Sequence, residues 1–374
     1  MQIGRLLKRI GPVSMVLASL ARWSDEDLKR TAEEFDLRLV TRFVPAPLKG
    51  PWQRLRREFD PTYLNTQGFA VSAEATRTVQ ALAREHDVVW IHTMRLANVF
   101  RFSHLAHSVL DLDDVLSCYW RQAAKTTRSW KQALVARRLV WQWRRREKLA
   151  LARFSSLTVC SRDDRAYLGD DPRIHVVPNG FDLPTVSQPP WDRARPRLGI
   201  IGSFAFLPNV DGLQWFLSEV WPLVRRSVPD AELRLIGAES DKVAAAAGQA
   251  GVVGLGYVDD PAEEIGTWSA FIVPLRLGAG TRVKIAESFA RGCATVSTAL
   301  GAFGYPVRHD NEILIADTAP DFAEACRVLL TDPVTRARLG RAGQDFFRAH
   351  LSWDAIEPAV RAAVESCWKR EALR

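Results

Sequence analysis

The sequence of 374 residues is poor in cysteine, with five cysteines scattered along it and no pair spaced as C-x-x-C. This pattern argues against a disulfide framework or a zinc site and is typical of a reducing cytosol. The chain has no run of eighteen apolar residues, so it predicts no transmembrane helix. The first residues are basic, but their apolar run is too short for the core of a signal peptide. These absences favour a cytoplasmic protein.

What is present is the composition of a soluble globular protein, with 47% apolar and 25% charged residues. The length is sufficient for two domains. Positive charge is concentrated in the first half: residues 1–186 carry 30 Lys and Arg against 20 Asp and Glu, whereas the remainder carries 21 against 23. This imbalance predicts an anionic partner for the first half.

One stretch, residues 278–292, combines a glycine-rich turn with a helix. It reads GAGTRVKIAESFARG and follows a short apolar run that predicts a buried strand. Gly278 and Gly280 stand where the strand gives way to the helix, and Thr281 is a suitable N-cap. Helical spacing predicts one apolar face, made of Val283, Ala286, Phe289 and Ala290.

The residues of this stretch also predict an anion-binding site. A helix start preceded by glycines offers backbone N–H groups and a positive dipole end to an anion. Arg282 and Lys284 add two cations there, which are unfavourable at a helix N-terminus unless a phosphate or diphosphate is bound. Glu287, one turn deeper, is suited to accept two hydroxyls of a ribose. The alternative is a surface helix in which Glu287 pairs with Lys284 or Arg291.

Four further motifs stand in order before this stretch. They are VVPNGFD at 176–182, GSFAFLPNVD at 202–211, LIG at 235–237 and GYVDD at 256–260. Together with residues 278–292 they resemble the retaining GT-B glycosyltransferases of the large family called glycosyl transferases group 1. The resemblance implies an α/β fold of two Rossmann-like, doubly wound domains facing a cleft. It places an N-terminal, acceptor-side domain at 1–186 with a crossing helix at 353–374, and a nucleotide-sugar domain at 187–352.

The resemblance also implies the donor site. The expected nucleotide-binding residues are Gly202, Ser203, Gly256, Tyr257, Gly278, Gly280, Thr281 and Glu287. Many relatives carry an arginine and a lysine where this chain has Ser203 and Pro208, so Arg282 and Lys284 are expected to supply that charge as catalytic groups. The family's usual first glutamate corresponds to Ala279, which leaves the identity of the donor open. We expect a UDP- or GDP-sugar donor, no metal ion and no other cofactor.

The first domain departs from the family pattern at its start. Residues 3–10 predict a helix and residues 13–17 the second strand, so we expect the first strand and most of its glycine loop to be absent from this sequence. A late start of the chain is the favoured explanation, and a fold that does without this element is the other. We expect a gap or an uncovered edge in the sheet. His92 ends a strand at 87–92, where the resemblance implies contact with the donor sugar, although a capping or packing role is equally open. Residues 111–114 invite a metal interpretation, which the resemblance disfavours.

Residues 120–154 predict a long helix or a helix pair in which tryptophan alternates with arginine. Residues 101–150 carry 11 Lys and Arg against 4 Asp and Glu. This pattern suits an anionic membrane surface, although a solvated basic face with core tryptophans remains open. We recognise no nucleic-acid module. Residues 45–61, rich in proline and arginine, are expected to form a loop.

Three functions are compatible with these motifs. The first is transfer of a sugar with retention to a lipid-linked or polysaccharide acceptor, by a cytoplasmic protein peripheral to the inner membrane face. The second is epimerisation of a nucleotide sugar, and the third is a degenerate, non-catalytic binding partner. The missing first strand and Ala279 favour the third; the ordered motifs favour the first.

Overall fold

The computed structural model describes residues 2–20, 22–64, 68–127, 129–184, 195–278 and 281–368. The chain divides into two compact units: unit 1 is Met1–Val177 with Glu357–Arg374, and unit 2 is Pro178–Ile356. The boundary expected between residues 186 and 187 lies outside the described residues. Helix α16 (Trp353–Glu365) begins in unit 2 and ends in unit 1.

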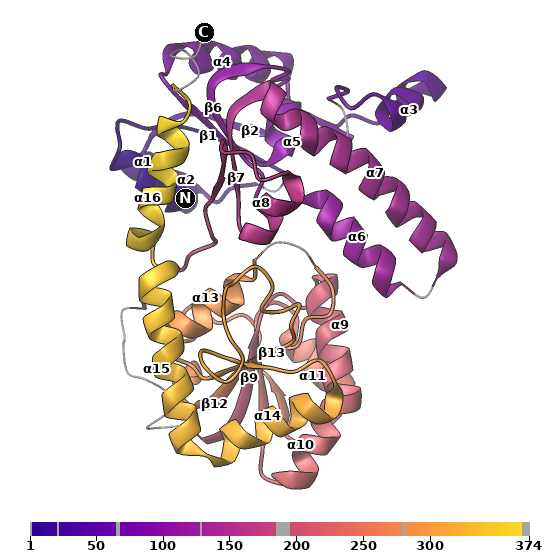
Figure 1. The fold of residues 1–374 in the computed structure, drawn as a ribbon, viewed down its shortest axis with the longest axis vertical. Coiled ribbons are helices and arrows are strands. Elements are labelled where there is room, and N and C mark those ends of the chain that lie inside the picture. The colour runs from indigo at the N-terminus through magenta and orange to yellow at the C-terminus, as the bar shows by residue number, and fades with distance from the viewer. Residues whose placement is uncertain are drawn as a thin grey trace. The chain divides into compact units, whose positions relative to one another are not determined.

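Unit 1 alternates helices with short strands. In chain order they are α1 (Gln2–Lys8), β1 (Ser14–Ser19), α2 (Asp25–Glu34), β2 (Asp36–Arg42), β3 (Val44–Pro45), α3 (Gly50–Phe59), β4 (Phe69–Ala70), α4 (Ala73–Glu85), β5 (Val89–His92), α5 (Thr93–Val99), β6 (Leu105–Asp111), α6 (Leu116–Thr126), α7 (Trp130–Arg153), β7 (Phe154–Val159), α8 (Arg162–Leu168) and β8 (Ile174–Val176). The segment 120–154 is therefore a helix pair, α6 and α7, packed side by side (Figure 1).

The strands of unit 1 form separate sheets. A four-stranded parallel sheet has the order β5-β6-β7-β8, β1 and β2 form a parallel pair, and β3 and β4 an antiparallel pair. In the described part of the chain, β1 hydrogen-bonds only to β2 and β5 only to β6. One apolar core, which includes Val79, Ile91 and Leu157, nevertheless receives Val16 of β1 and Leu39 of β2. Side-chain packing thus joins strands that the backbone does not pair.

Residues 45–61 do not form the expected loop, because α3 lies within them. The proline content is no obstacle, since Pro51 stands in the first helical turn, where no intrahelical N–H is needed. The apolar residues Trp52, Leu55 and Phe59 have helical spacing, a signal hidden by the surrounding arginines.

Unit 2 repeats the alternation around one parallel sheet. Its elements are β9 (Arg195–Ile201), α9 (Leu207–Trp215), a π-helical turn (Phe216–Val220), α10 (Trp221–Ser227), β10 (Glu232–Ile236), α11 (Ser240–Ala247), β11 (Val252–Gly254), α12 (Ala262–Ile265), β12 (Trp268–Val273), α13 (Val283–Ala290), β13 (Thr295–Ser297), β14 (Leu314–Ile315), α14 (Ala319–Thr331) and α15 (Pro333–His350). The strand order is β11-β10-β9-β12-β13-β14.

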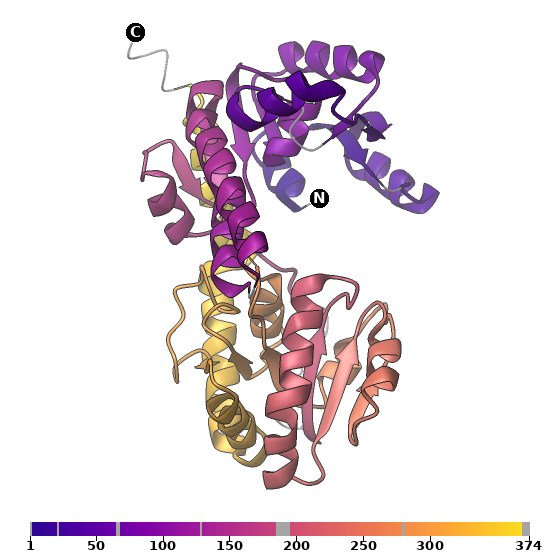
Figure 2. The same ribbon diagram turned by 90° about the vertical axis from the view of Figure 1, so that its right-hand side faces the viewer.

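Helices cover both faces of this sheet, which makes unit 2 doubly wound. One face packs against α9, α10 and α14, and the other against α13 and α15. In Figure 1, β9 and β12 lie between α13 and α15 on one side and α9 on the other, and Figure 2 shows α9 and α10 from the front. The central strand β12 is buried along its whole length, as expected for a parallel strand with both faces covered.

Among the described residues, no helix combines the length and the apolar character needed to span a bilayer.

Two motifs that are far apart in the sequence meet in unit 2. The Phe181 amide donates to the carbonyl of Leu351 at 3.4 Å, and Trp353 Nε1 donates to Asp182 Oδ1 at 2.8 Å. Gly180 makes this approach possible, because a Cβ there would lie 2.8 Å from the oxygen of Leu351 and 2.7 Å from Ile356 Cδ1.

We therefore expect Gly180→Ala to destabilise unit 2 by about 1–3 kcal/mol, the cost of forcing an extra methyl group into a packed contact. The urea midpoint of unfolding measures this change. Gly11→Ala is the matched control, since a Cβ at Gly11 has nothing within 4 Å. Equal midpoints for the two variants would contradict the packing argument.

Candidate functional site

The candidate site of unit 2 lies where strands β9 and β12 end and α13 begins. Arg282 occupies the N-cap position of α13, and no side chain caps this helix end. The expectation that Thr281 is the N-cap is wrong, because the helix begins one residue later and Thr281 is buried. The Thr281 hydroxyl has no hydrogen-bond partner within the described part of the chain. Gly280 and Ala279 lie outside the described residues.

Arg282 is held close to the glycine turn. A Cβ on Gly278 would lie 2.7 Å from Arg282 Nη2, so the guanidinium occupies the space beside that glycine. The hydroxyl of Tyr305 donates to the Arg282 carbonyl at 3.0 Å and fixes the backbone at the helix start. The helix end, with its positive dipole, thus carries a positioned cation.

Lys284 points back toward the end of β9. Its Nζ donates to Asn209 Oδ1 at 2.9 Å, and Asn209 Nδ2 donates to the Ser203 carbonyl at 2.8 Å. Gly202 lets this network close, because a Cβ there would lie 2.8 Å from Asn209 Nδ2 and 3.0 Å from Lys284 Nζ. The structure therefore brings Gly202, Ser203 and Lys284 together.

The electrostatics of this cluster are unfavourable for a free cation. Burial and, to a smaller extent, the nearby charge of Arg282 lower the pKa of Lys284 to about 8, against the opposing effect of Glu287. A lysine whose charge is desolvated and repelled in this way is stabilised by any anion that reaches it. Perturbed lysines of this kind are typical of functional sites.

Glu287 faces two cations from its own helix. Arg291 contacts Glu287 Oε1 through Nη2 at 3.1 Å, and both side chains are 12% exposed. Burial raises the pKa of Glu287, while Arg291 and then Lys284 oppose the rise. The Arg291 guanidinium also lies over the ring of Phe181 at 5.8 Å. The pairing of Glu287 with Arg291 that the surface-helix alternative predicted is therefore present, and it uses Oε1. Ribose binding by Glu287 stays a prediction.

The apolar face of α13 differs by one residue from the prediction. Ala286, Phe289 and Ala290 are buried as expected, but Val283 is 45% exposed and Ile285 is buried instead. Val283 is the first residue of the helix and faces outward, and packing against the core begins at Ile285.

The remaining nucleotide candidates lie beyond β11. The Gly256 amide donates to Ser240 Oγ at 2.9 Å, and its carbonyl accepts from the Gly237 amide at 2.8 Å. Tyr257 is 77% exposed, so its ring is accessible for stacking. These contacts fix the backbone of the Gly256 loop and leave the role of both residues a prediction.

His92 ends β5 in unit 1 and occupies the N-cap position of α5, where its side chain makes no capping bond. Its Nδ1 lies 2.9 Å from Asp111 Oδ2, and Thr158 Oγ1 donates to Asp111 Oδ1 at 2.9 Å. This hydrogen bond raises the pKa of His92, opposed by burial and helped by the charges of Asp111 and Asp113. The ring is therefore oriented by a carboxylate, with Nε2 as its other edge.

The acidic run 111–114 shows no metal-binding arrangement. Among the described residues, no group of three or more His, Cys, Asp or Glu side chains is placed to hold a metal ion. Asp111 is engaged by His92 and Thr158, and the Cys160 thiol donates to the Asp113 carbonyl at 3.0 Å. These contacts anchor the loop after β6.

Sequence reasoning missed two residues of the site. Asn209, which no sequence motif singled out as a ligand, is 7% exposed and links Lys284 to the end of β9. Arg291 was considered only as a surface partner, yet its side chain is only 12% exposed and is a counter-charge to Glu287. A polar side chain in the buried first turn of α9 was the only available signal for Asn209.

The sequence of unit 2 was compared with known protein families. Residues 195–332 match the model of the family described as glycosyl transferases group 1. A Klebsiella pneumoniae protein, described as an uncharacterized 44.6 kDa protein in cps region, is 26% identical to this chain over 129 residues. That match covers 32% of the chain and about a third of the curated relative's length.

Solved structures show the fold of the whole chain. Anabaena HepE in complex with UDP and glucose is 14% identical, with a TM-score of 0.61 over 98% of this chain and 94% of HepE. WaaG, described as a glycosyltransferase involved in lipopolysaccharide biosynthesis, is 15% identical, with a TM-score of 0.60 over 96% and 93% of the two chains. The chain therefore has the GT-B fold of these glycosyltransferases.

The contact between His92 and Asp111 leads to a testable prediction about the pKa of His92. We expect Asp111→Asn to lower the pKa of His92, because the substitution removes both the hydrogen bond to the charged ring and the neighbouring charge. Since the folded-state pKa is raised, the pair stabilises the fold fully below about pH 6.5 and stops doing so as pH rises through the folded pKa. NMR titration of the ring protons measures the shift. Asp113→Asn should lower it less, and an equal or absent effect of Asp111→Asn would contradict the geometry.

Proposed function

We propose that this protein transfers a sugar from a UDP- or GDP-sugar to a glycan or lipid-linked acceptor, with retention and without a metal ion. The observation that carries the proposal is the cationic start of α13. Arg282 and the partly buried Lys284 repel one another beside a helix end that no side chain caps. A diphosphate would relieve that repulsion and accept hydrogen bonds from the helix end.

In this proposal the two cations act on the departing group. As the bond between the sugar C1 and the diphosphate oxygen breaks, the diphosphate takes the electron pair and its negative charge grows. Positioned cations and the helix dipole stabilise that charge more than they stabilise the intact donor, which is the condition for a faster reaction. Arg282 and Lys284 would take the part that a metal ion plays elsewhere.

The other residues bind and orient the donor in our proposal. Gly202 and Ser203 border the diphosphate, Gly256 and Tyr257 frame the base, and Glu287 accepts the ribose hydroxyls with the oxygen that faces away from Arg291. A charged hydrogen bond of this kind contributes about 1.5–3 kcal/mol. His92 belongs to unit 1, and we propose that it contacts the donor sugar.

The relatives support the choice of donor and acceptor. The HepE structures hold UDP with glucose, or UDP-glucose, and WaaG is described as acting in lipopolysaccharide biosynthesis. Those properties are known for those proteins, and we extend them here as a proposal for polysaccharide or lipid-linked glycan biosynthesis.

A non-catalytic binding partner is the second candidate, favoured by Ala279 in place of the family's first glutamate. Incubation with UDP- and GDP-sugars and a glycan acceptor in the presence of EDTA separates the candidates. Transfer with the donor's anomeric configuration kept in the product supports the proposal. Donor binding without transfer or hydrolysis supports the binding partner, and free epimerised sugar supports an epimerase.

We expect Arg282→Ala to lower turnover about 100- to 1,000-fold at saturating donor while changing donor affinity far less, because its charge acts mainly on the developing negative charge. Steady-state kinetics with varied donor measures both parameters. Arg226→Ala, at an exposed position in the last turn of α10, is the control and should leave both unchanged. Unchanged turnover of Arg282→Ala would refute the assigned role.

Binding of a nucleoside diphosphate should also change the protonation of Lys284. The pKa of about 8 in the free protein leaves this lysine mostly neutral at about pH 9, and a bound diphosphate favours the charged form. We expect uptake of close to one proton per UDP or GDP bound at about pH 9 and little uptake at about pH 7.

Isothermal titration in two buffers of different ionisation enthalpy measures this proton uptake. Lys284→Gln should abolish it, and Lys242→Gln should retain it because Lys242 is an exposed lysine, 72% accessible. The same uptake in wild type and Lys284→Gln would show that another group titrates.

A further inference from the structure

Helix α3 exposes an apolar stripe that no other described part of the chain covers. None of its ten residues is buried. Trp52, Leu55 and Phe59 stand three and four residues apart, so they share one face, and they are 75%, 48% and 57% exposed. Figures 1 and 2 both show α3 at the margin of unit 1. A helix with such a stripe usually packs it against a core, so this exposure requires an explanation.

The outer face of α7 continues this apolar surface. Trp130, Leu134 and Trp141 recur at helical spacing on one side and are 69%, 53% and 43% exposed. The rings of Phe59 and Trp141 meet edge to face with centroids 5.9 Å apart, which joins the stripe of α3 to that of α7. We call these six exposed side chains, together with the exposed cations Arg54 and Arg137, the α3–α7 surface.

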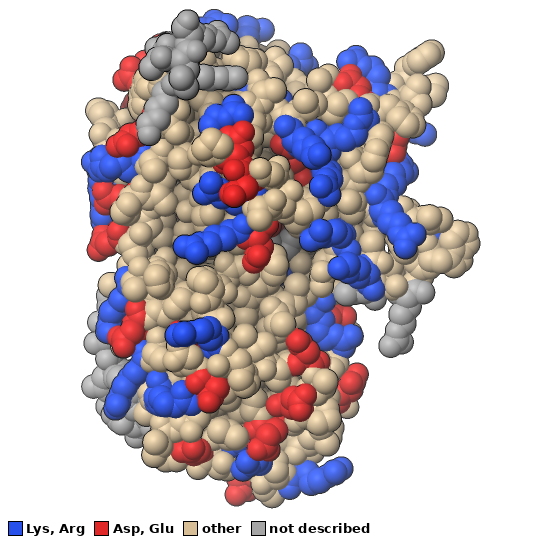
Figure 3. All heavy atoms as spheres, in the orientation of Figure 1, with Lys and Arg blue, Asp and Glu red and all other residues tan. Residues whose placement is uncertain are grey.

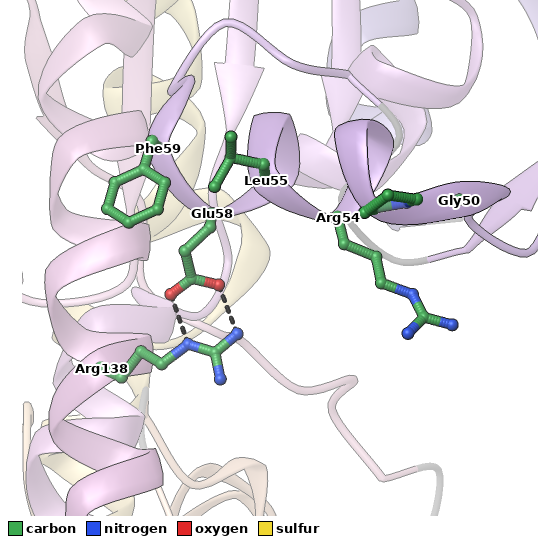
Figure 4. A pocket seen from close by; sticks show the side chains of 7 residues that line it. Gly50, Arg54, Leu55, Glu58, Phe59 and Arg138 are labelled. Atoms are coloured by element: carbon green, nitrogen blue, oxygen red, sulfur yellow. Dashed lines mark hydrogen bonds and ion pairs between the residues drawn. The ribbon is translucent and has the colours of Figure 1, made fainter.

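Polar contacts fix α3 against α7. Glu58 forms an ion pair with Arg138, Arg145 Nη1 donates to the Phe59 carbonyl at 3.1 Å, and Arg146 donates to the Arg57 carbonyl. Between the helices lies an open cavity of about 680 Å³ (Figure 4). In this view Leu55 and Phe59 lie close to Glu58, whereas the Arg54 side chain extends away from the Glu58–Arg138 ion pair. The apolar and basic groups are therefore presented by a fixed pair of helices.

The charge of these helices is almost entirely positive. The sequence of α3 contains three Arg and one Glu, and that of α7 contains eight Lys or Arg and one Glu. Neither glutamate is free to face a partner, since Glu58 is paired with Arg138 and Glu147 is buried. Figure 3 shows Lys and Arg side chains gathered over the region of α7. A second copy of such a surface would be repelled by it.

We propose that the α3–α7 surface docks on an anionic phospholipid bilayer. Exposed tryptophans and leucines suit insertion at the level of the headgroups, and surrounding arginines suit lipid phosphates. Long arginine stems can cover apolar surface while the guanidinium stays in the headgroup layer. Nucleic acid would match the charge but not the exposed leucine and phenylalanine side chains. This surface is separate from the nucleotide site, so vesicle binding does not depend on the proposed transfer reaction.

Co-sedimentation of the full chain with vesicles tests the proposal. Wild type should bind vesicles of phosphatidylcholine with about 30% phosphatidylglycerol, bind pure phosphatidylcholine far less, and dissociate as salt rises. Trp52→Ala with Trp130→Ala should lower the partition coefficient at least about tenfold. Arg54→Gln with Arg137→Gln should lower it about thirtyfold, because each cation near an anionic surface contributes about 1 kcal/mol.

The matched control is Trp368→Ala with Val334→Ala, which removes an aromatic and an aliphatic side chain exposed by 42% and 77% outside the α3–α7 surface. This control should bind like wild type. Absence of wild-type binding, or equal binding by all variants, would overturn the proposal. So would a dimer in solution that Trp52→Ala with Trp130→Ala abolishes, or binding to RNA that is tighter than binding to the anionic vesicles.

Discussion

The candidate site of unit 2 is organised around one electrostatic constraint, the confinement of Arg282 and Lys284 at the start of α13. Repulsion and desolvation oppose this arrangement, and they lower the pKa of Lys284 to about 8. Neutral contacts hold it in place: Asn209 accepts from Lys284 and donates to the Ser203 carbonyl, and Tyr305 donates to the Arg282 carbonyl. In our proposal this arrangement preorganises the site for an anion, because the two cations are already held together before a ligand binds.

The same constraint explains what Glu287 can do. Glu287 is a largely enclosed carboxylate near Lys284 and Arg291: burial raises its pKa, and both cations oppose the rise. Arg291, which also lies over Phe181, fixes one face of the carboxylate. A carboxylate has two oxygens that accept hydrogen bonds. Glu287 can therefore pair with Arg291 and, as we propose, also accept the hydroxyls of a ribose.

Much of the fold follows from the sequence, because alternating apolar strands and amphipathic helices require a covered parallel sheet. The starts of helices were harder to predict. Thr281 has the residue type of an N-cap, yet tertiary packing begins the helix at Val283 and turns Ile285 inward. Helix α3 was missed because proline and arginine imitate a loop. Asn209 was missed because its partner, Lys284, is 75 residues away, and spacing along the chain carries no signal of such a contact.

The two units use positive charge in physically different ways. In unit 2 a partly buried lysine and an arginine converge on one helix end, where the low dielectric screens each charge little, which suits a compact anion. In unit 1 the exposed cations of α7, such as Lys131 and Arg137, share their helix with the exposed Trp130 and Trp141, and water and salt weaken each charge there. Such a surface gains affinity only by summing many weak contacts, which suits an extended array of anions. In our proposals, burial rather than the number of cations therefore distinguishes the ligand of one unit from that of the other.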